Sequence, residues 1–440
     1  MLFLSDGAKK AIELLKSSGN EAYIVGGSVR DMIMGLKAND YDITTSATPD
    51  EMKKAFQGFT VIETGIKHGT VTFLYEKEPI EVTTYRIDGD YKDSRHPESV
   101  EFTKNLHNDL SRRDFTMNAL VYNEDDGIID IFGGQNDIEN KIIRAIGDPK
   151  KRFQEDALRI LRGVRFASQL GFEIEKKTKE AMIECAPLLH NISKERINVE
   201  ISKFLMGKNV KKTLLENYDI IGEIIPEIKA MHAFDQNSKY HIYDVLEHTA
   251  IAIENIESIL HLRLAMLFHD VGKPKTYSVD ENGQGHFYGH AKTSTEIAKR
   301  FLDEYRFDNA TKERVLELVK LHDTPIELDR IFIKKRMNRI GADSFFDLLK
   351  VKRADNLAQN PEYFWTDKLD KMEELAKEIE AESCFTLQSL DISGNDLIAL
   401  GIKGRQIGET LNQLLNEVIE ERLSNEKELL IKRANEIFKK

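Results

Sequence analysis

The 440-residue sequence is poor in cysteine, with only Cys185 and Cys384, which lie far apart in the chain. This excludes a disulfide framework and a CxxC zinc or redox motif, so any bound metal would need His, Asp or Glu ligands. No apolar run approaches the ~18 residues that span a bilayer, and the opening MLFLSDGAKK lacks the basic and apolar segments of a signal peptide. We therefore expect a cytoplasmic protein that has no membrane partner.

Positive charge is also in short supply. Lys and Arg together number 63 and Asp and Glu 75, which gives a formal net charge of −12. Over the whole chain this balance argues against a polyanionic partner, although a nucleic-acid-binding protein needs only one basic track on its surface. Such a track is present between residues 141 and 165, where eight basic side chains accompany three acidic ones.

The pattern of apolar residues changes near residue 150. Before this point, short β-rich runs such as EAYIVGG, GTVTFLY and PIEVTTYR are separated by Gly, Pro and Asp, which predicts an α+β head with a twisted sheet and flanking helices. After it, nearly every segment has the 3.6-residue period of an amphipathic helix, including one helix expected over residues 151–170. We expect a long all-α neck, body and tail, with domains at 1–150, 151–236, 237–365 and 366–440.

The head carries a strand, a glycine turn and two aspartates within a short stretch. The apolar run YIV ends in Gly26 and Gly27, a helix containing Arg30 is expected next, and DYD places Asp40 and Asp42 at the start of another β-like run. Residues two apart in a strand face the same side, so the two carboxylates would form a Mg²⁺ site. The glycine turn and the helix start offer N–H groups to phosphate, and Arg30 offers a bidentate contact.

GGSVRD followed by DYD resembles the first signature of the class II tRNA nucleotidyltransferases, the bacterial CCA-adding enzymes, whose head is shared with bacterial poly(A) polymerases. Further blocks resemble the family in the right order: YRIDGDYKDSRHPESVEF at 85–102, DLSRRDFTMNAL at 109–120, DIFGGQNDI at 130–138, EDALRILRGVRF at 155–166 and SKERI at 193–197. The matches cover about the first 200 residues. The resemblance implies a nucleotidyltransferase-type mixed sheet in the head.

The resemblance also implies roles for individual residues. Asp40 and Asp42 would hold the catalytic Mg²⁺ ions. The triphosphate would be bound by Gly26, Gly27, Arg30 and Arg113, the ribose would lie near Asn118, and the base would contact Asp156 and Arg159, with Arg162 and Arg165 continuing the same helix face. A carboxylate and a guanidinium one helical turn apart match the amino group and ring nitrogen of C and A, whereas U and G place a carbonyl opposite the carboxylate.

The helical body contains a second set of metal-ligand residue types. His248, the adjacent His269 and Asp270, and a late Asp355 resemble the four defining ligands of the HD phosphohydrolase superfamily. His290 and His322 are similar to the extra histidines of its two-metal members. A mixed nitrogen and oxygen ligand set suits Mn²⁺, Fe²⁺, Co²⁺, Ni²⁺ or Zn²⁺. The resemblance implies a phosphatase or 2′,3′-cyclic phosphodiesterase activity for this HD body, or a scaffold that packs on tRNA.

These observations lead to one principal hypothesis, the template-independent addition of CCA to tRNA 3′ ends from CTP and ATP. The alternatives are an A-adding tRNA nucleotidyltransferase, a poly(A) polymerase, and an HD metal-dependent phosphohydrolase whose head only binds RNA. The loop at 85–102, with Arg95 and Pro97, favours the CCA type over a poly(A) polymerase and over enzymes that add only CC. The tail is expected to bind tRNA, with Lys403 and Arg405 as candidate phosphate contacts.

Overall fold

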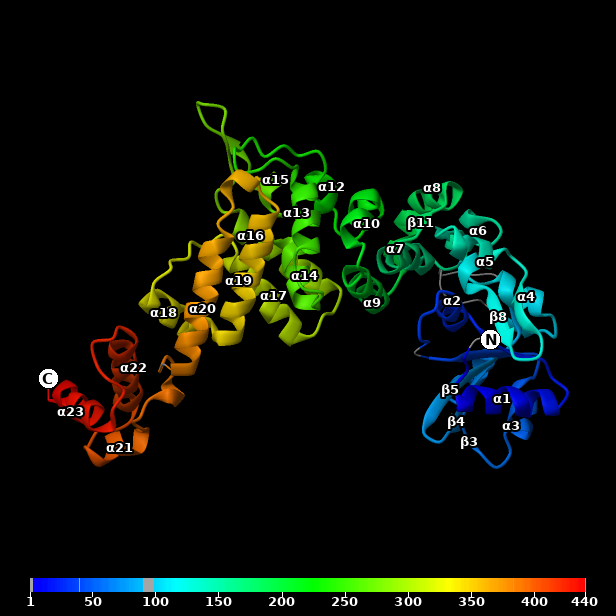
Figure 1. Ribbon diagram of the computed structural model, residues 1–440, viewed down its shortest axis with the longest axis horizontal. Coiled ribbons are helices and arrows are strands. Elements are labelled where there is room, and N and C mark those ends of the chain that lie inside the picture. The colour runs from blue at the N-terminus through cyan, green and yellow to red at the C-terminus, as the bar shows by residue number, and fades with distance from the viewer. Residues whose placement is uncertain (1–2, 39, 90–98, 383, 440) are drawn as a thin grey trace. The chain divides into compact units, whose positions relative to one another are not determined.

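The structure is a computed structural model that describes residues 3–38, 40–89, 99–382 and 384–439 (Figure 1). The chain forms two compact units, Met1–Lys229 and Ala230–Lys440. The expected α+β head followed by a largely helical remainder is confirmed. The finer division into four domains stays a prediction.

Seven strands of the first unit form one mixed sheet in the order β3-β4-β5-β2-β1-β8-β9. These strands are β1 (Ala22–Val25), β2 (Asp42–Thr45), β3 (Thr60–Ile62), β4 (Thr70–Tyr75), β5 (Glu78–Thr84), β8 (Leu120–Asn123) and β9 (Gly127–Asp130). β2 and β5 pair in parallel, and the other neighbours pair antiparallel. Because β1 is apolar on both faces and lies inside the sheet, it is buried along its whole length.

Helices pack on the sheet of the first unit, and further helices follow the sheet in the chain. They are α1 (Asp6–Ser17), α2 (Gly27–Ile33), α3 (Pro49–Ala55), α4 (Leu106–Ser111), α5 (Gly134–Glu139), α6 (Pro149–Glu155), α7 (Leu158–Leu170), α8 (Lys176–Cys185), α9 (Lys194–Leu205), α10 (Val210–Glu216), α11 (Tyr218–Ile221) and α12 (Glu227–Met231). α1 packs on β1 and β5 (Figure 1). The short strands β10 (Ile142–Ile143) and β11 (Glu173–Ile174) pair in parallel beside α7.

The single helix expected over residues 151–170 is wrong, because the structure has two helices there. α6 ends at Glu155 and α7 begins at Leu158, since Asp156 is in an extended conformation with φ −140° and ψ 101°. The Asp156 side chain accepts a hydrogen bond from the Leu158 N–H at 3.1 Å. This local bond offers the backbone an alternative to the helix, as Asp side chains commonly do. Asp156 and Arg159 are therefore not one turn apart on a single helix.

The second unit is built from helices. They are α13 (Val245–Glu254), α14 (Leu260–Phe268), α15 (Lys273–Thr276), α16 (His290–Glu304), α17 (Asn309–Leu321), α18 (Arg330–Ile340), α19 (Ala342–Leu357), α20 (Thr366–Glu382), α21 (Gly394–Ala399), α22 (Arg405–Ile419) and α23 (Lys427–Phe438). A hairpin of β12 (Ser278–Val279) and β13 (Gly285–His286) interrupts them. One hydrophobic cluster runs from Ile326 to Ala434 and joins the last helices of the unit.

The loop expected over residues 85–102 is described only at its two ends. There, β6 (Arg86–Asp88) and β7 (Val100–Phe102) form an antiparallel pair. Residues 90–98, which include Arg95 and Pro97, lie outside the described residues. No helix in the described part of the chain combines the length and apolar character needed to cross a membrane.

Candidate functional site

The turn between β1 and α2 depends on one of its two glycines. Gly26 has φ +81° and ψ −134°, a conformation that side chains rarely adopt, and a Cβ there would lie 3.4 Å from Arg113 Nη1. Gly27 has an ordinary helical backbone, and its added Cβ would meet Arg30 Nη2 at an acceptable 3.5 Å. The turn thus brings the start of α2 and Arg113 close to the same backbone segment.

Asp42 is the first residue of β2, whereas Asp40 precedes the strand. The strand alternation predicted for this pair is therefore wrong, although Asp40 still raises the pKa of Asp42. Loss of solvent around the carboxylate raises this pKa most, and Glu81 is the next cause. Glu81 lies opposite Asp42 in the parallel register of β2 and β5. Sequence analysis missed Glu81 because a parallel register cannot be read from local sequence.

A chain of buried polar side chains connects α2 to α7. Arg30 donates to Asp31 Oδ1 through Nε and Nη2 at 2.9 and 2.7 Å, and to Asn118 Oδ1 through Nη1 at 2.8 Å. Asn118 Nδ2 then donates to Asp114 Oδ1 at 3.1 Å, and Arg162 Nε donates to Asp114 Oδ2 at 2.6 Å. Burial alone would raise the pKa of Asp114, but Arg162 and Asn118 bring it down to about 2.

Asp109, on α4, fixes Arg112 and Arg113, the two consecutive arginines of the DLSRRDFTMNAL segment. Its side chain is fully buried and accepts hydrogen bonds from Arg112 Nε and Nη2 at 3.1 and 2.8 Å. Its other oxygen lies 3.5 Å from Arg113 Nη2 and accepts a hydrogen bond from Thr44 Oγ1 at 2.9 Å. Burial would raise the pKa of Asp109, but the two arginines outweigh it and lower the pKa. Sequence analysis had quoted this motif without assigning Asp109 a role.

The predicted residues of the head converge on one cavity of about 550 Å³. Its lining includes Gly26, Gly27, Arg30, Asp42, Arg113, Asn118, Asp156, Arg159, Arg162 and Arg165. Asp40 is described and exposed but lies outside this lining. Eight cationic and three anionic side chains line the cavity, so it attracts anions although the whole chain is acidic.

Asp156 lies in the cavity at the break between α6 and α7, and it is held from α9. Arg196 Nη2 and Nη1 donate to Asp156 Oδ2 and Oδ1 at 2.9 and 3.4 Å. Together with the Leu158 N–H, these bonds fix the carboxylate while leaving it further lone pairs. Arg196 stands in the SKERI segment, but sequence analysis did not single it out. No spacing rule links residues 40 positions apart.

Arg159 is more constrained than expected, because three of its five N–H groups donate to protein oxygens. Nη1 donates to Arg152 O and Glu155 Oε2 at 2.9 and 2.8 Å, and Nη2 donates to Arg112 O at 2.7 Å. Its side chain is only 10% exposed. Its carboxylate partner is therefore Glu155, while Asp156 binds Arg196.

Arg162 and Arg165, which were expected to continue one face of the helix, each form an ion pair with a buried carboxylate. Arg165 Nε lies 3.2 Å from Glu200 Oε2, and Arg162 bonds to Asp114. The Phe166 ring lies among three guanidinium groups, with Arg165, Arg30 and Arg162 Cζ at 4.3, 5.1 and 5.5 Å from its centroid. Cation–π attraction of this kind holds several positive charges together at one wall of the cavity.

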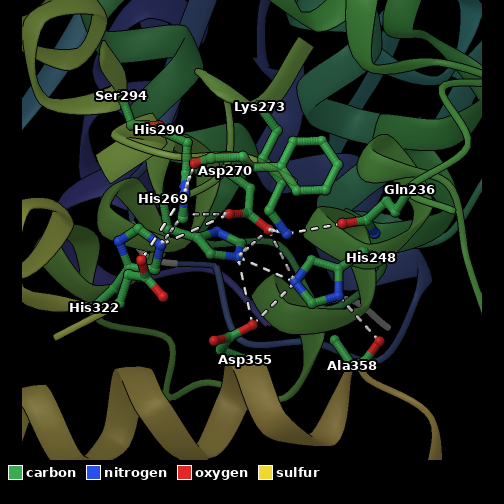
Figure 2. A network of polar contacts seen from close by, with 12 residues as sticks. Gln236, His248, His269, Asp270, Lys273, His290, Ser294, His322, Asp355 and Ala358 are labelled. Carbon is green, nitrogen blue, oxygen red and sulfur yellow. Dashed lines mark hydrogen bonds and ion pairs between the residues drawn. The ribbon is translucent and has the colours of Figure 1, made fainter. Parts of the chain in front are cut away.

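The second predicted constellation forms a compact cluster in the second unit (Figure 2). His248 Nε2 lies 3.0 Å from Asp355 Oδ1 and 3.3 Å from Asp270 Oδ2, and His269 Nε2 lies 3.2 Å from the same Asp270 oxygen. The other Asp270 oxygen lies 3.4 Å from His290 Nε2 and 3.6 Å from His322 Nε2. Asp270 is therefore shared by two sets of candidate ligands, each with its atoms within 4.8 Å of one another.

All four histidines are oriented in the same way. Nδ1 of each lies at hydrogen-bond distance from a backbone carbonyl oxygen: His248 from Ala358 at 3.0 Å, His269 from Met266 at 2.7 Å, His290 from Phe287 at 2.9 Å and His322 from Val319 at 2.7 Å. A carbonyl can only accept, so Nδ1 carries the proton and, in each neutral ring, Nε2 presents a lone pair to the centre.

This arrangement fits a bound cation. Nε2 of His248 lies 3.1 Å from Nε2 of His269, and Nε2 of His290 lies 3.1 Å from Nε2 of His322. Two lone pairs facing each other at that distance repel unless a proton or a metal ion lies between the rings. Burial alone would raise the pKa of Asp270, but His269 and Lys273 hold it well below its usual range, so the shared carboxylate stays charged.

Lys273 adds a positive charge at the edge of the cluster. Its Nζ lies 2.7 Å from Asp270 Oδ2 and donates to Gln236 Oε1 at 2.8 Å (Figure 2). It lines a cavity of about 350 Å³ together with His241, Asp270, His290 and other residues. Sequence analysis did not single out Lys273. A buried lysine next to a metal-type cluster provides a contact for an anionic substrate.

Comparison with known proteins agrees with the geometry of both units. Three family models match: "Poly A polymerase head domain" over residues 22–144, "Probable RNA and SrmB-binding site of polymerase A" over residues 171–231, and a second domain of tRNA nucleotidyltransferases over residues 286–434. The head model covers the seven-stranded sheet and the residues of the first cavity from Gly26 to Asn118. The third covers His290, His322 and Asp355.

Curated relatives match over nearly the whole chain. The CCA-adding enzyme of Bacillus cytotoxicus is 35% identical over 425 residues, covering 95% of this chain and 95% of the relative. That of Pediococcus pentosaceus is 33% identical over 438 residues, covering 99% and 98%. The crystal structure of Bacillus stearothermophilus CCA-adding enzyme in complex with CTP has a TM-score of 0.73 at 29% identity, covering 98% of this chain and 97% of that one. Thermotoga maritima CCA-adding enzyme complexed with tRNA CCA shares the fold, with a TM-score of 0.61 at 20% identity and coverage of 98% and 94%.

The depressed pKa of Asp114 predicts an acid-dependent contribution to stability. The contribution is present above the usual pKa of 3.8 and disappears as the pH falls through about 2, because only the charged carboxylate binds Arg162 and Asn118. We expect Asp114→Asn to lower the free energy of unfolding by about 2 kcal/mol at pH 6, with the difference shrinking between pH 4 and pH 2. Denaturant unfolding across this pH range measures it. Asp50→Asn, at a side chain that is 88% exposed, is the matched control. A difference that stays constant with pH would contradict the prediction.

Proposed function

The chain belongs to the CCA-adding enzyme family, and on this premise we propose that it adds the 3′-terminal CCA of tRNA from CTP and ATP without a nucleic-acid template. The observation that carries the proposal is the single cavity that combines the Asp42 carboxylate, a cluster of cations and the Asp156 carboxylate. A triphosphate needs the first two, and selection of a base needs the third.

The reaction transfers a nucleotidyl group. The 3′-hydroxyl oxygen of tRNA forms a bond to the α-phosphorus and releases its proton to solvent, the bond from that phosphorus to the oxygen bridging to the β-phosphate breaks, and pyrophosphate leaves. Arg30 and Arg113 neutralise the triphosphate, and their fixed positions lower the cost of orienting it. Asn118 would contact the ribose.

Asp42 and Asp40, with Glu81 beside them, would hold Mg²⁺. Loss of solvent raises the pKa of Asp42 most, and the nearby charges of Glu81 and Asp40 raise it further, an environment that a divalent cation would relieve. Bound Mg²⁺ would supply charge neutralisation at the triphosphate and lower the pKa of the attacking hydroxyl. Asp42 lines the cavity and is proposed as the principal ligand, with Asp40 and Glu81 as its neighbours.

Base selection is assigned to Asp156, with Arg159 beside it. The carboxylate accepts a hydrogen bond from the exocyclic amino group of C or A, while a carbonyl of U or G in the same place would put two acceptors opposite each other with no proton between them. Arg159 keeps N–H groups that can donate to the base after its protein contacts are made. Arg162 and Arg165 would contribute charge at the wall that carries Phe166.

The first experiment measures extension of tRNAs that end before CCA, after C and after CC, with CTP, ATP or both. We expect addition to stop at CCA, and we expect Asp42→Ala to reduce the rate by at least about 10³-fold because the metal-binding carboxylate is lost. Asp50→Ala is the matched control. Addition of A alone to the CC-ended tRNA would identify an A-adding enzyme, and a long A tail a poly(A) polymerase. No incorporation would overturn the proposal.

The contact between Arg196 and Asp156 predicts a change in nucleotide preference. Arg196→Ala removes two charge-assisted hydrogen bonds from the carboxylate. Because bonds of this type are worth roughly 1.5–3 kcal/mol, we expect kcat/KM for CTP to fall between about tenfold and 100-fold while that for UTP changes less. Single-turnover incorporation of each nucleotide measures the ratio. Arg196→Lys keeps the charge but not the paired bonds, so its kcat/KM for CTP should lie between those of Arg196→Ala and the unaltered protein. An unchanged ratio of kcat/KM for CTP to kcat/KM for UTP would show that Arg196 has no role in base selection.

We also propose a second activity, metal-dependent phosphoester hydrolysis in the second unit. The observation that favours it is the common orientation of four histidines around Asp270, with Lys273 alongside. In this reaction a water oxygen bonds to phosphorus, the phosphorus–oxygen bond to the leaving group breaks, and that oxygen takes up a proton. A bound Mn²⁺, Fe²⁺, Co²⁺, Ni²⁺ or Zn²⁺ would supply the activated water. His248, His269, Asp270 and Asp355 would form one metal site, and His290 and His322 would complete a second one with Asp270.

The second activity is tested with bis(p-nitrophenyl) phosphate and p-nitrophenyl phosphate in the presence of each metal. We expect hydrolysis that is lost on chelation and reduced by at least about 10³-fold in His269→Ala, because one metal ligand is removed. CCA addition by His269→Ala should remain within about twofold of the unaltered protein, since the first cavity lies in the other unit. Metal content after dialysis gives a second readout. Equal hydrolysis by both proteins would show that the activity arises elsewhere.

A further inference from the structure

An exposed aromatic pair stands at the cavity of the second unit. Tyr288 is 79% exposed, which is unusual for so large a ring, and its ring is stacked on His286 with centroids 5.2 Å apart and an interplanar angle of 9°. His286 is the last residue of β13, and Tyr288 follows two residues later in the turn that leads into α16. The tyrosine ring is thus stacked on His286 with an offset, and most of it faces solvent.

The histidine of the pair is held in place by the hairpin. Asp280 Oδ2 lies 3.0 Å from His286 Nε2, and Asp280 Oδ1 accepts hydrogen bonds from the N–H groups of Asn282 and Gln284 at 2.9 and 3.0 Å. The imidazole is therefore fixed by the same carboxylate that orders the turn. A ring that stacks on a fixed neighbour loses little further entropy when a ligand covers its other face.

Phe287, which lies between His286 and Tyr288 in the chain, contacts residues of the metal-type cluster. Phe287 lies with its ring centroid 5.3 Å from Lys273 Nζ, and the Phe287 carbonyl accepts from His290 Nδ1. Lys273 in turn pairs with Asp270. The aromatic pair and the candidate phosphate site are therefore connected through Phe287, which contacts both Lys273 and His290.

One cavity holds both parts. Tyr288 and His286 line the same cavity of about 350 Å³ as Asp270, Lys273 and His290. Tyr240, which is 42% exposed, also lines it, with Lys239 Nζ 5.1 Å from its ring centroid. Stackable rings beside cations are the features with which proteins bind unpaired nucleotides. A phosphoester without a base would use only the cluster and Lys273.

We propose that the Tyr288–His286 pair is a stacking platform for the base of a nucleotide whose phosphate occupies the Asp270–Lys273 end of the cavity. This inference rests on the second activity proposed above and names its substrate class, a nucleoside phosphoester. Tyr288 acts as a binding residue that selects for a base, while the residues around Asp270 contact the phosphate.

The test compares adenosine 3′-monophosphate with glycerol 2-phosphate, which has no base, as substrates of the full chain with Mn²⁺. We expect Tyr288→Ala to raise KM for the nucleotide about tenfold, in line with the stacking energy of one base, and to leave its kcat and both constants for glycerol 2-phosphate within about twofold. Tyr288→Phe should restore the nucleotide KM because it keeps the ring. Val279→Ala, at a 52% exposed residue of the same hairpin, is the matched control.

Two results would overturn the platform: an unchanged nucleotide KM in Tyr288→Ala, or an equal rise in KM for both substrates, which indicates a displaced hairpin. If the unaltered protein hydrolyses neither substrate, the second activity fails, and the platform is tested by titration of adenosine 3′-monophosphate followed by calorimetry. Because the first unit is unchanged in Tyr288→Ala, the difference between the two titrations reports the platform. Weaker binding by Tyr288→Ala then supports it, and equal binding overturns it.

Discussion

The first cavity depends on the need to pair charges that are buried together. Arg30, Asn118 and Asp114 are each less than a tenth exposed, and none of them could stay there alone without a large desolvation cost. The hydrogen bonds that connect them continue to Arg162 and so link α2 to α7. Asp109 likewise pairs with the charges of Arg112 and Arg113. The geometry of the candidate nucleotide site follows from these satisfied charges more than from any hydrophobic contact.

In the histidine cluster of the second unit, the charges and lone pairs are not all matched by other groups of the described residues. Its four histidines are fixed by backbone carbonyls at Nδ1, and this leaves their Nε2 atoms facing one another at distances that need a cation or a shared proton. Whereas the charges of the first cavity are largely balanced by protein groups, the second cluster carries an arrangement that an added ion would complete.

Much of the fold was predictable because its signals are local. The β-rich runs, the glycine turn and the change to helical period near residue 150 depend on neighbouring residues, and the head with its helical remainder is confirmed. The motifs also placed ten residues that line one cavity. The errors arose where local chemistry overrode periodicity, as when the Asp156 side chain broke the expected helix.

Other features depended on pairings that sequence spacing does not reveal. Glu81 meets Asp42 only through the parallel register of two strands, and Arg196 reaches Asp156 from another helix. The exposed state of Tyr288 could not be read from the sequence either, since an isolated tyrosine near a turn is equally consistent with burial. The specific partners of charged groups were thus the least predictable part of both sites.

The division into two compact units has an evolutionary consequence. Every described residue that lines the first cavity comes from one unit, and every described member of the histidine cluster comes from the other. A substitution that abolishes one centre therefore leaves the packing of the other intact. Selection can retain, modify or discard the histidine cluster in one lineage while the nucleotide cavity remains under constraint, so members of one family can differ in their second chemistry without losing the first.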